Sequence, residues 1–372
     1  MDTNKQKKFF TILGFCLIMV CLFPVLKSGL YSDDLHNFQL KNNPTVRQQS
    51  IIDLSRPLID FWKSSGRYTP ISAILTELVF RCFNTLETYK LFVFIMNLLA
   101  IAVFLLYLSS LNLGINTPIW LLCFGAVIQL RVTFHDAFSS INGMYQVLSV
   151  LLFLSLLFYC MFLKRQKNKF LILSVFLFAT ALLLSEVGMT VLILMPVSAL
   201  ILKTPRKLFF KSYLPALLIA AIYLGYVGWL RVYKFNPAFS YQGLEMRLDL
   251  QSMWTLLKKQ LYASLPLSNL DGQYKIPRIL SFQLANPVNL FAIIAIIIIA
   301  VIILHGFHRN KPIYDSRLFF SILLFSLVMM ITPAIFILPS VKYQNQVFWG
   351  SAYLPVYLQN FGSATLLACL FQ

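Results

Sequence analysis

Residues 291–304 read FAIIAIIIIAVIIL, an unbroken apolar run with no charged or turn-forming residue. A membrane-spanning β-strand alternates apolar and polar residues, and this run does not. Comparable apolar blocks of about 17 to 23 residues recur along the chain, long enough to cross a hydrocarbon core of about 30 Å as α-helices. Because only helices and closed barrels span a bilayer, the sequence predicts an all-α membrane protein.

Composition agrees with this interpretation, since 59% of the 372 residues are hydrophobic and only 12% are charged. Soluble domains carry about 25% charged residues. The net charge of +18 comes from 31 basic and 13 acidic residues. The basic residues lie in loops between apolar blocks rather than on one face, so no nucleic-acid partner is predicted.

We predict one transmembrane module over residues 1–372, a polytopic helical bundle of about ten spans. The first span follows a basic N-terminus and lacks a small-residue cleavage site, so it is interpreted as a retained anchor. The predicted spans are residues 9–27, 90–111, 118–134, 144–163, 170–186, 188–203, 212–231, 287–305, 317–339 and 351–371.

Loop charge predicts the orientation, because short cytoplasmic loops carry an excess of Lys and Arg. With the N-terminus in the cytoplasm, the basic clusters 5–8, 164–169, 203–211 and 309–317 all fall inside. Two long segments, 28–89 and 231–286, then lie outside. The piece from Ile71 to Phe83 in the first of them is too short and too charged to span, so an interfacial helix is predicted there.

Candidate functional residues gather on the predicted outer side. For each of them a structural role is the alternative: a solvated turn or loop for the acids and Arg67, a helix cap for Asp136, and an interfacial aromatic for Tyr353. A lone Glu such as Glu186 between apolar blocks is costly unless it is paired, protonated or at the surface. The candidates are Asp33, Asp34, Arg67, His135, Asp136, Glu186, Lys342 and Tyr353.

The order of these motifs resembles the GT-C class of integral-membrane glycosyltransferases, especially the protein O-mannosyltransferase-like branch. The shared order is Asp33-Asp34 after the first span, then Gly-Arg-Tyr-Thr-Pro at 66–70, then an outer His-Asp turn within 134–142. Segments 185–190 and 351–355 resemble two further motifs of that branch. Here Ser351-Ala352 replaces the Glu-Arg of the last motif, and the second His of the outer turn is missing.

The resemblance implies a polyprenyl-phosphate sugar as donor and a glycan, lipid or protein as acceptor. It implies Asp33 or Asp34 as the base, and Arg67 and Lys342 as cations for the leaving phosphate. No cofactor is required, although an Asp-rich site suits Mg²⁺ or Mn²⁺. Abundant Phe, Ile, Leu, Lys and Asn is typical of an AT-rich bacterial genome, so the bacterial cytoplasmic membrane is the predicted location.

Two other functions remain open from the sequence. A transporter or flippase of a lipid-linked glycan or similar amphiphile places ionisable groups near the bilayer midplane, often within repeated halves. Here the ionisable residues lie mainly in the outer segments. A non-catalytic membrane scaffold is the third possibility, and it gives the Asp pair no purpose.

Overall fold

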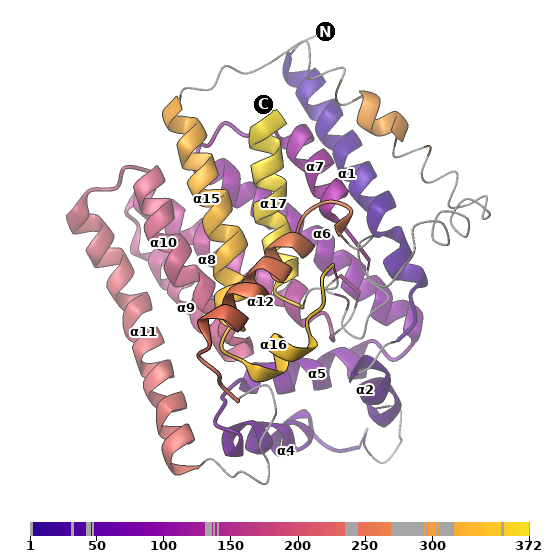
Figure 1. The fold of residues 1–372 in the computed structure, drawn as a ribbon, viewed down its shortest axis with the longest axis vertical. Coiled ribbons are helices and arrows are strands. Elements are labelled where there is room, and N and C mark those ends of the chain that lie inside the picture. The colour runs from indigo at the N-terminus through magenta and orange to yellow at the C-terminus, as the bar shows by residue number, and fades with distance from the viewer. Residues whose placement is uncertain are drawn as a thin grey trace.

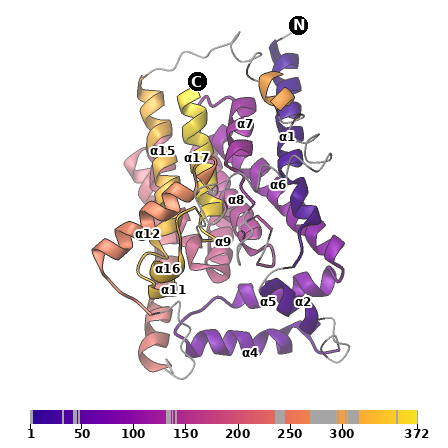
Figure 2. The same ribbon diagram turned by 45° about the vertical axis from the view of Figure 1, so that its right-hand side comes forward.

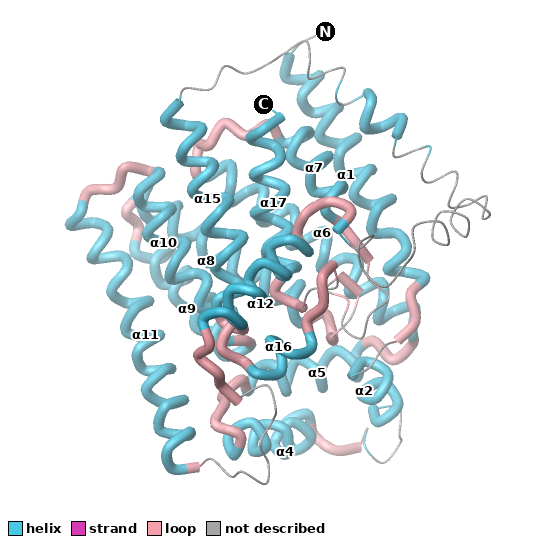
Figure 3. The backbone as a smooth tube through the Cα atoms, viewed as in Figure 1, coloured by secondary structure: helices cyan, strands magenta, loops and turns pink. Residues whose placement is uncertain are grey.

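The computed structural model describes residues 3–30, 33–41, 48–130, 141–234, 245–268, 316–350 and 353–371, together with 46, 136, 138–139, 294, 297–302 and 304. Over this part of the chain the fold is all-helical, without a β-strand (Figure 3). The elements are α1 (Thr3–Lys27), α2 (Asp33–Lys41), α4 (Ile51–Ser64), α5 (Pro70–Cys82), α6 (Leu86–Ser110), α7 (Thr117–Val127), α8 (Met144–Arg165), α9 (Asn168–Leu184), the 3₁₀ turn η1 (Glu186–Met189), α10 (Thr190–Ile201), α11 (Arg206–Tyr233), α12 (Leu250–Ala263), α15 (Ser316–Ile335), α16 (Val341–Gln346) and α17 (Val356–Phe371).

Five of the described helices are long and apolar enough to cross a membrane, namely α1 from Lys5, α6, α8, α11 and α15. Each overlaps a predicted span, so the chain is a helical membrane protein. Four more predicted spans correspond to shorter apolar helices: α7, α9, α10 with η1, and α17. Most of the predicted span 287–305 lies outside the described residues, and the total of ten spans stays a prediction.

Helix α7 shows why a predicted span shortens. The apolar run predicted a helix over 118–134, but α7 ends at Val127 after 11 residues, about 16 Å of rise. Ile128 is extended, and the Gln129 side-chain amide donates to the Leu265 carbonyl oxygen at 2.5 Å. The chain therefore leaves the helix to meet the segment that follows α12, a contact between residues far apart in the sequence.

The helices from α6 to α11 stand side by side and successive ones run in opposite directions, so their connections lie at two ends (Figure 1). The start of α1, the α6–α7, α8–α9 and α10–α11 turns, and the start of α15 lie at one end, the basic end. Helices α2, α4 and α5 lie across the opposite end, transverse to the bundle, in both views (Figures 1 and 2). The loops predicted to share one side of a membrane thus share one end of the molecule.

The predicted interfacial piece from Ile71 to Phe83 coincides with α5. It is not isolated, because α5 packs against α2, α4, α8 and α9 and buries Ala73, Thr76, Glu77, Val79 and Phe80. Its location at a membrane interface stays a prediction. The packing means that α5 links the transverse helices to the bundle.

The bundle core is built around aromatic rings contributed by separate helices. The ring centre of Phe104 on α6 lies 4.7 Å from that of Phe153 on α8, 4.9 Å from Phe361 on α17 and 5.2 Å from Trp120 on α7. Such edge-on and tilted ring pairs add about 0.5–1.5 kcal/mol each beyond the area they bury. The Trp120 indole N–H donates to the Thr365 hydroxyl at 2.9 Å, which satisfies the one polar atom of that ring. This core fixes α6, α7, α8 and α17 above the transverse helices.

Candidate functional site

The Asp pair begins helix α2, and its two side chains have different surroundings. Carboxylates are favoured in a first helical turn because they face the positive end of the helix dipole. Successive residues of a helix point about 100° apart, so the two cannot share one environment. Asp33 is exposed, whereas Asp34 is fully buried. The structure therefore gives the two carboxylates different environments.

Asp34 is held by the turn before α8 and by α6. Its Oδ2 accepts a hydrogen bond from the Tyr89 hydroxyl at 2.7 Å, and its Oδ1 accepts one from the Asn142 backbone N–H at 2.8 Å. Ile141 and Asn142 both adopt positive φ, at 60° and 54°. That conformation is strained for a β-branched residue such as Ile141 and persists only where the surroundings require it. Asp34 supplies such a requirement by holding the Asn142 amide.

A second set of buried polar groups lies beside Asp34. The Lys90 amine donates to the Ser139 carbonyl oxygen at 2.8 Å, and the Phe138 backbone N–H donates to Asp136 Oδ1 at 2.9 Å. Asp136 is thus an acceptor within a local turn, and this bond does not cap a helix. His135 lies outside the described residues. We call Asp34, Tyr89, Lys90, Asp136 and Asn142 the Asp34 cluster.

Burial raises the pKa of Asp34 to about 6, against the lowering effects of the Tyr89 and Asn142 hydrogen bonds and the charge of Lys90. The pKa of this carboxyl group is higher in the folded protein than in the unfolded protein. Between the two pKa values the folded protein therefore binds the proton and the unfolded protein does not. Acidification from pH 7 through 6 toward 4 is therefore expected to stabilise the fold by up to about 3 kcal/mol through Asp34. The check is thermal unfolding in detergent across this pH range.

Asp34→Asn should remove that pH dependence while keeping the fold. The Asn oxygen still accepts from the Asn142 amide, and its NH₂ meets the Tyr89 hydroxyl oxygen. Asp60→Asn, at an exposed position on α4, is the control and should keep the wild-type pH profile. Identical profiles for wild type and Asp34→Asn would contradict the assignment.

Arg67 is positioned by the end of helix α4. Gly66 has φ +75°, and the Arg67 backbone N–H donates to the Trp62 carbonyl oxygen at 2.8 Å, a C-terminal motif that requires a left-handed residue. A Cβ on Gly66 would also come within 2.7 Å of Arg231 Cγ. The Arg67 guanidinium then lies over the Trp62 ring at 4.9 Å. Local chain geometry therefore aims this side chain inward.

The partner of Arg67 is Glu186, 119 residues away in the sequence. Arg67 Nε donates to Glu186 Oε1 at 2.5 Å and Nη2 donates to Oε2 at 2.6 Å, a bidentate ion pair. Their side chains are 23% and 32% exposed, so the pair is only partly buried.

Glu186 reaches this place because the chain reverses tightly between α9 and α10. Ser185 caps η1 by accepting from the Val187 backbone N–H at 3.4 Å. A Cβ on Gly188 would come within 2.9 Å of both the carbonyl carbon and oxygen of Ala181, so only glycine allows this approach. The predicted spans 170–186 and 188–203 are thus joined by a four-residue 3₁₀ turn that presents Glu186.

Tyrosine rings surround the ion pair. Tyr343 and Tyr223 interact electrostatically with Arg67, and Tyr145 interacts with both Arg67 and Glu186. Tyr353 joins through Tyr343, with ring centres 4.3 Å apart and hydroxyl oxygens 3.4 Å apart. Lys342 precedes Tyr343 on α16.

The structure thus brings Arg67, Glu186 and Tyr353 into one group, the Arg67 site, defined by Arg67, Glu186, Tyr145, Tyr343 and Tyr353. The structure also places Asp34 and Asp136 together, in the neighbouring Asp34 cluster. Helix α8 connects the two, because Asn142 precedes its start and Tyr145 lies in its first turn. The elements that carry these groups, among them α2, the α4–α5 connection and α16, lie at the end of the bundle opposite the basic end (Figure 2).

Sequence reasoning missed Tyr89, Lys90 and Tyr145, whereas Asn142 and Tyr343 lie in candidate segments but were assigned no role. Lys90 carried a signal, because a lysine at the start of an apolar block is costly to bury without a partner. The tyrosines carried none, since rings at a predicted interface are common. No group of three or more His, Cys, Asp or Glu side chains placed to hold a metal ion is found among the residues that the structure describes.

Comparison with known proteins adds no relative from which a role could be transferred. The chain matches no family model, no curated protein and no solved structure.

Proposed function

We propose that this protein is a membrane glycosyltransferase that moves a sugar from a polyprenyl-phosphate-linked donor to an acceptor hydroxyl. The supporting observation is convergence: the exposed Asp33, the Arg67–Glu186 pair and the Tyr343–Tyr353 rings come from distant parts of the sequence to one end of the bundle. A lipid-linked donor presents its phosphate and sugar at the same depth, where the hydrocarbon core meets water. The arrangement suits chemistry at that boundary.

In the proposed reaction Asp33 is the base and Asp34 is a positioning residue. The acceptor oxygen attacks the anomeric carbon and forms the new C–O bond as its proton passes to Asp33. The bond from the anomeric carbon to the phosphate oxygen breaks, and the lipid phosphate leaves with the electron pair. Attack opposite the leaving group inverts the anomeric centre. Asp34 is already engaged by Tyr89 and Asn142, so it fixes the start of α2 and thereby the direction of Asp33.

The departing phosphate needs cations, and the proposal assigns this role to Arg67 and Lys342. Glu186 occupies Nε and Nη2 of Arg67, which leaves Nη1 for a ligand, since a guanidinium has five N–H donors. A planar, preorganised donor stabilises developing charge without reorganising. Tyr343 and Tyr353 offer ring faces and hydroxyls to a sugar.

The proposed location is a cytoplasmic membrane, with the N-terminus inside and the acidic groups outside. This orientation is supported by the positions of the connecting segments. The basic turns lie together at one end of the bundle and the acidic segments lie at the other (Figure 1). The donor would then be used from the outer leaflet. The acceptor is a glycan, lipid or protein carrying a free hydroxyl.

The direct test is sugar release from vesicles containing the purified full-length chain. Polyprenyl-phosphate donors with a labelled sugar are added with a mixed panel of hydroxyl acceptors, and free polyprenyl phosphate and labelled product are measured. Turnover that requires an acceptor is the expected result. Movement of the labelled donor between leaflets without cleavage would instead identify a flippase, and no turnover across a broad donor panel would reject the proposal.

A further inference from the structure

Arg231 is a second arginine beside the Arg67 site. It lies in the last turn of α11, and its Nε donates to the Gly66 carbonyl oxygen at 3.2 Å, one residue before Arg67. Gly66 has no side chain, so the Arg231 stem packs directly against the backbone there; a Cβ at this position would meet Arg231 Cγ at 2.7 Å. The Arg231 charge also interacts with Glu186, the partner of Arg67. Two guanidinium groups therefore interact with the same carboxylate.

Both guanidinium groups keep a nitrogen for a ligand. Arg67 uses Nε and Nη2 on Glu186, and Arg231 uses Nε on Gly66. Nη1 of Arg231 lies 3.4 Å from the Met246 sulfur, a weak acceptor. Within the described part of the chain no residue accepts a hydrogen bond from Arg67 Nη1 or Arg231 Nη2. Neither nitrogen is among the enclosed polar atoms, and both side chains are partly exposed, so a ligand can reach them.

The charges of this group favour an anion with more than one negative charge. Arg67 and Arg231 carry two positive charges and Glu186 carries one negative charge, which leaves the three side chains with a net +1. A phosphodiester carries one negative charge and has two free oxygens. A phosphate monoester carries nearly two negative charges at pH 7 and has three free oxygens. Because guanidinium groups bind such oxygens with paired N–H donors, two arginines suit the monoester better.

We propose that Arg67 and Arg231 together form a phosphate site, the two-arginine site, that prefers a lipid phosphate monoester to a phosphodiester. This inference rests on the proposed function, in which the donor is a phosphodiester and the departing lipid phosphate is a monoester. As the bond to the anomeric carbon breaks, its electron pair passes to the phosphate oxygen and the negative charge there grows. Arg231 then interacts more strongly with the leaving group than with the donor, which speeds the chemical step.

The experiment measures retention of farnesyl phosphate, a monoester, and of its methyl diester by the detergent-solubilised full-length protein at pH 8. Native mass spectrometry during titration gives both affinities, and the wild type is expected to prefer the monoester. Arg231→Gln should weaken monoester binding about tenfold, the loss expected for one hydrogen bond to a charged group, and diester binding much less. A purely structural role of Arg231 would weaken both ligands by the same factor.

Lys234→Gln is the matched control. Lys234 follows the last residue of α11, three positions after Arg231, and its side chain is exposed. Its substitution removes the same charge at the same end of the molecule and should change neither affinity.

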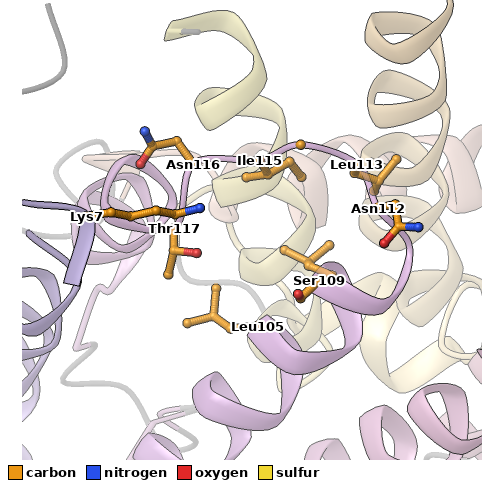
Figure 4. Close-up of a pocket in the computed structure, with 10 residues that line it drawn as sticks. Lys7, Leu105, Ser109, Asn112, Leu113, Ile115, Asn116 and Thr117 are labelled. Carbon is orange, nitrogen blue, oxygen red and sulfur yellow. The ribbon is translucent and has the colours of Figure 1, made fainter. Parts of the chain in front are cut away.

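A second control addresses another place where a lipid phosphate could bind. A cavity of about 360 Å³ lies at the basic end of the bundle between α1, α6 and α7, and Lys7 is the charged side chain among its described lining residues (Figure 4). Lys7→Gln should leave the preference for the monoester unchanged, because this cavity shares no residue with the two-arginine site.

The outcomes separate the source of the phosphate and the two proposals. Displacement of farnesyl phosphate by millimolar inorganic phosphate, lost in Arg231→Gln, would support the two-arginine site with the free anion as a further ligand, and no displacement would assign it to lipid-borne phosphate. No retention or no preference in the wild type, an equal loss of both ligands in Arg231→Gln, or a loss in Lys7→Gln instead would overturn the inference. Absence of sugar transfer in the vesicle assay would reject the proposed function and leave a measured monoester preference standing.

Discussion

Asp33→Asn is expected to lower the rate of sugar transfer by about 10²–10⁴-fold, the range in which a positioned base contributes. The substitution removes the proton acceptor and keeps the shape of the side chain. Because Asp33 is exposed at the start of α2, the unfolding temperature should change little. Release of polyprenyl phosphate from labelled donor, together with thermal unfolding in the same detergent, measures both effects.

Two neighbouring variants sharpen this prediction. Asp34→Asn should retain much of the activity, because the buried Asn still holds the Asn142 amide, while Asp60→Asn should behave as wild type. Loss of turnover in Asp34→Asn alone would make Asp34 the base. Full turnover in both Asp33→Asn and Asp34→Asn would remove the acid pair from the mechanism altogether.

The sequence predicted the helical membrane class because that property depends on composition and run length, which no tertiary contact changes. Segments such as 90–111 and 144–163 appear as α6 and α8 with boundaries shifted by a few residues. Helix α7 is shorter than its apolar run because Gln129 meets the Leu265 carbonyl. An apolar run predicts which segment is buried, but the residue at which the helix ends depends on contacts with residues distant in the sequence.

The candidate residues were predictable, but their pairings were not. Glu186 stood out as a lone carboxylate between apolar blocks, and Arg67 was predicted as a cation for the leaving phosphate, without a pairing between them. The structure pairs Arg67 with Glu186, because the C-terminal turn of α4 and the η1 reversal face each other. Asp34 is held by Tyr89, which carried no sequence signal, and by Asn142, whose turn was quoted but not linked to the Asp pair. Burial and pairing arise from three-dimensional packing.

Breaking the Arg67–Glu186 pair is expected to destabilise the protein and to abolish turnover. Removal of one partner of a fully buried pair costs about 3–5 kcal/mol, and partial exposure of these side chains lowers our expectation to about 2 kcal/mol. Glu186→Gln leaves the Arg67 charge without its counterion, and Arg67→Met leaves the carboxylate without its own. Thermal unfolding and the donor-release assay measure the two effects.

A double-mutant cycle separates the pair from its surroundings. The double variant Arg67→Met/Glu186→Gln should lose less stability than the two single variants lose together. In the double variant neither charge is left unpaired. The matched control is the exposed Lys63–Asp60 pair at 3.4 Å, where Asp60→Asn should cost only a few tenths of a kcal/mol. Arg67→Lys should keep part of the stability but little activity, since an ammonium cannot hold Glu186 at two oxygens and still offer a planar N–H to the phosphate. If the stability losses of the two single variants were additive, the two side chains would act separately. Arg67 would then not be held by Glu186 as the preorganised cation that the proposed phosphate stabilisation requires.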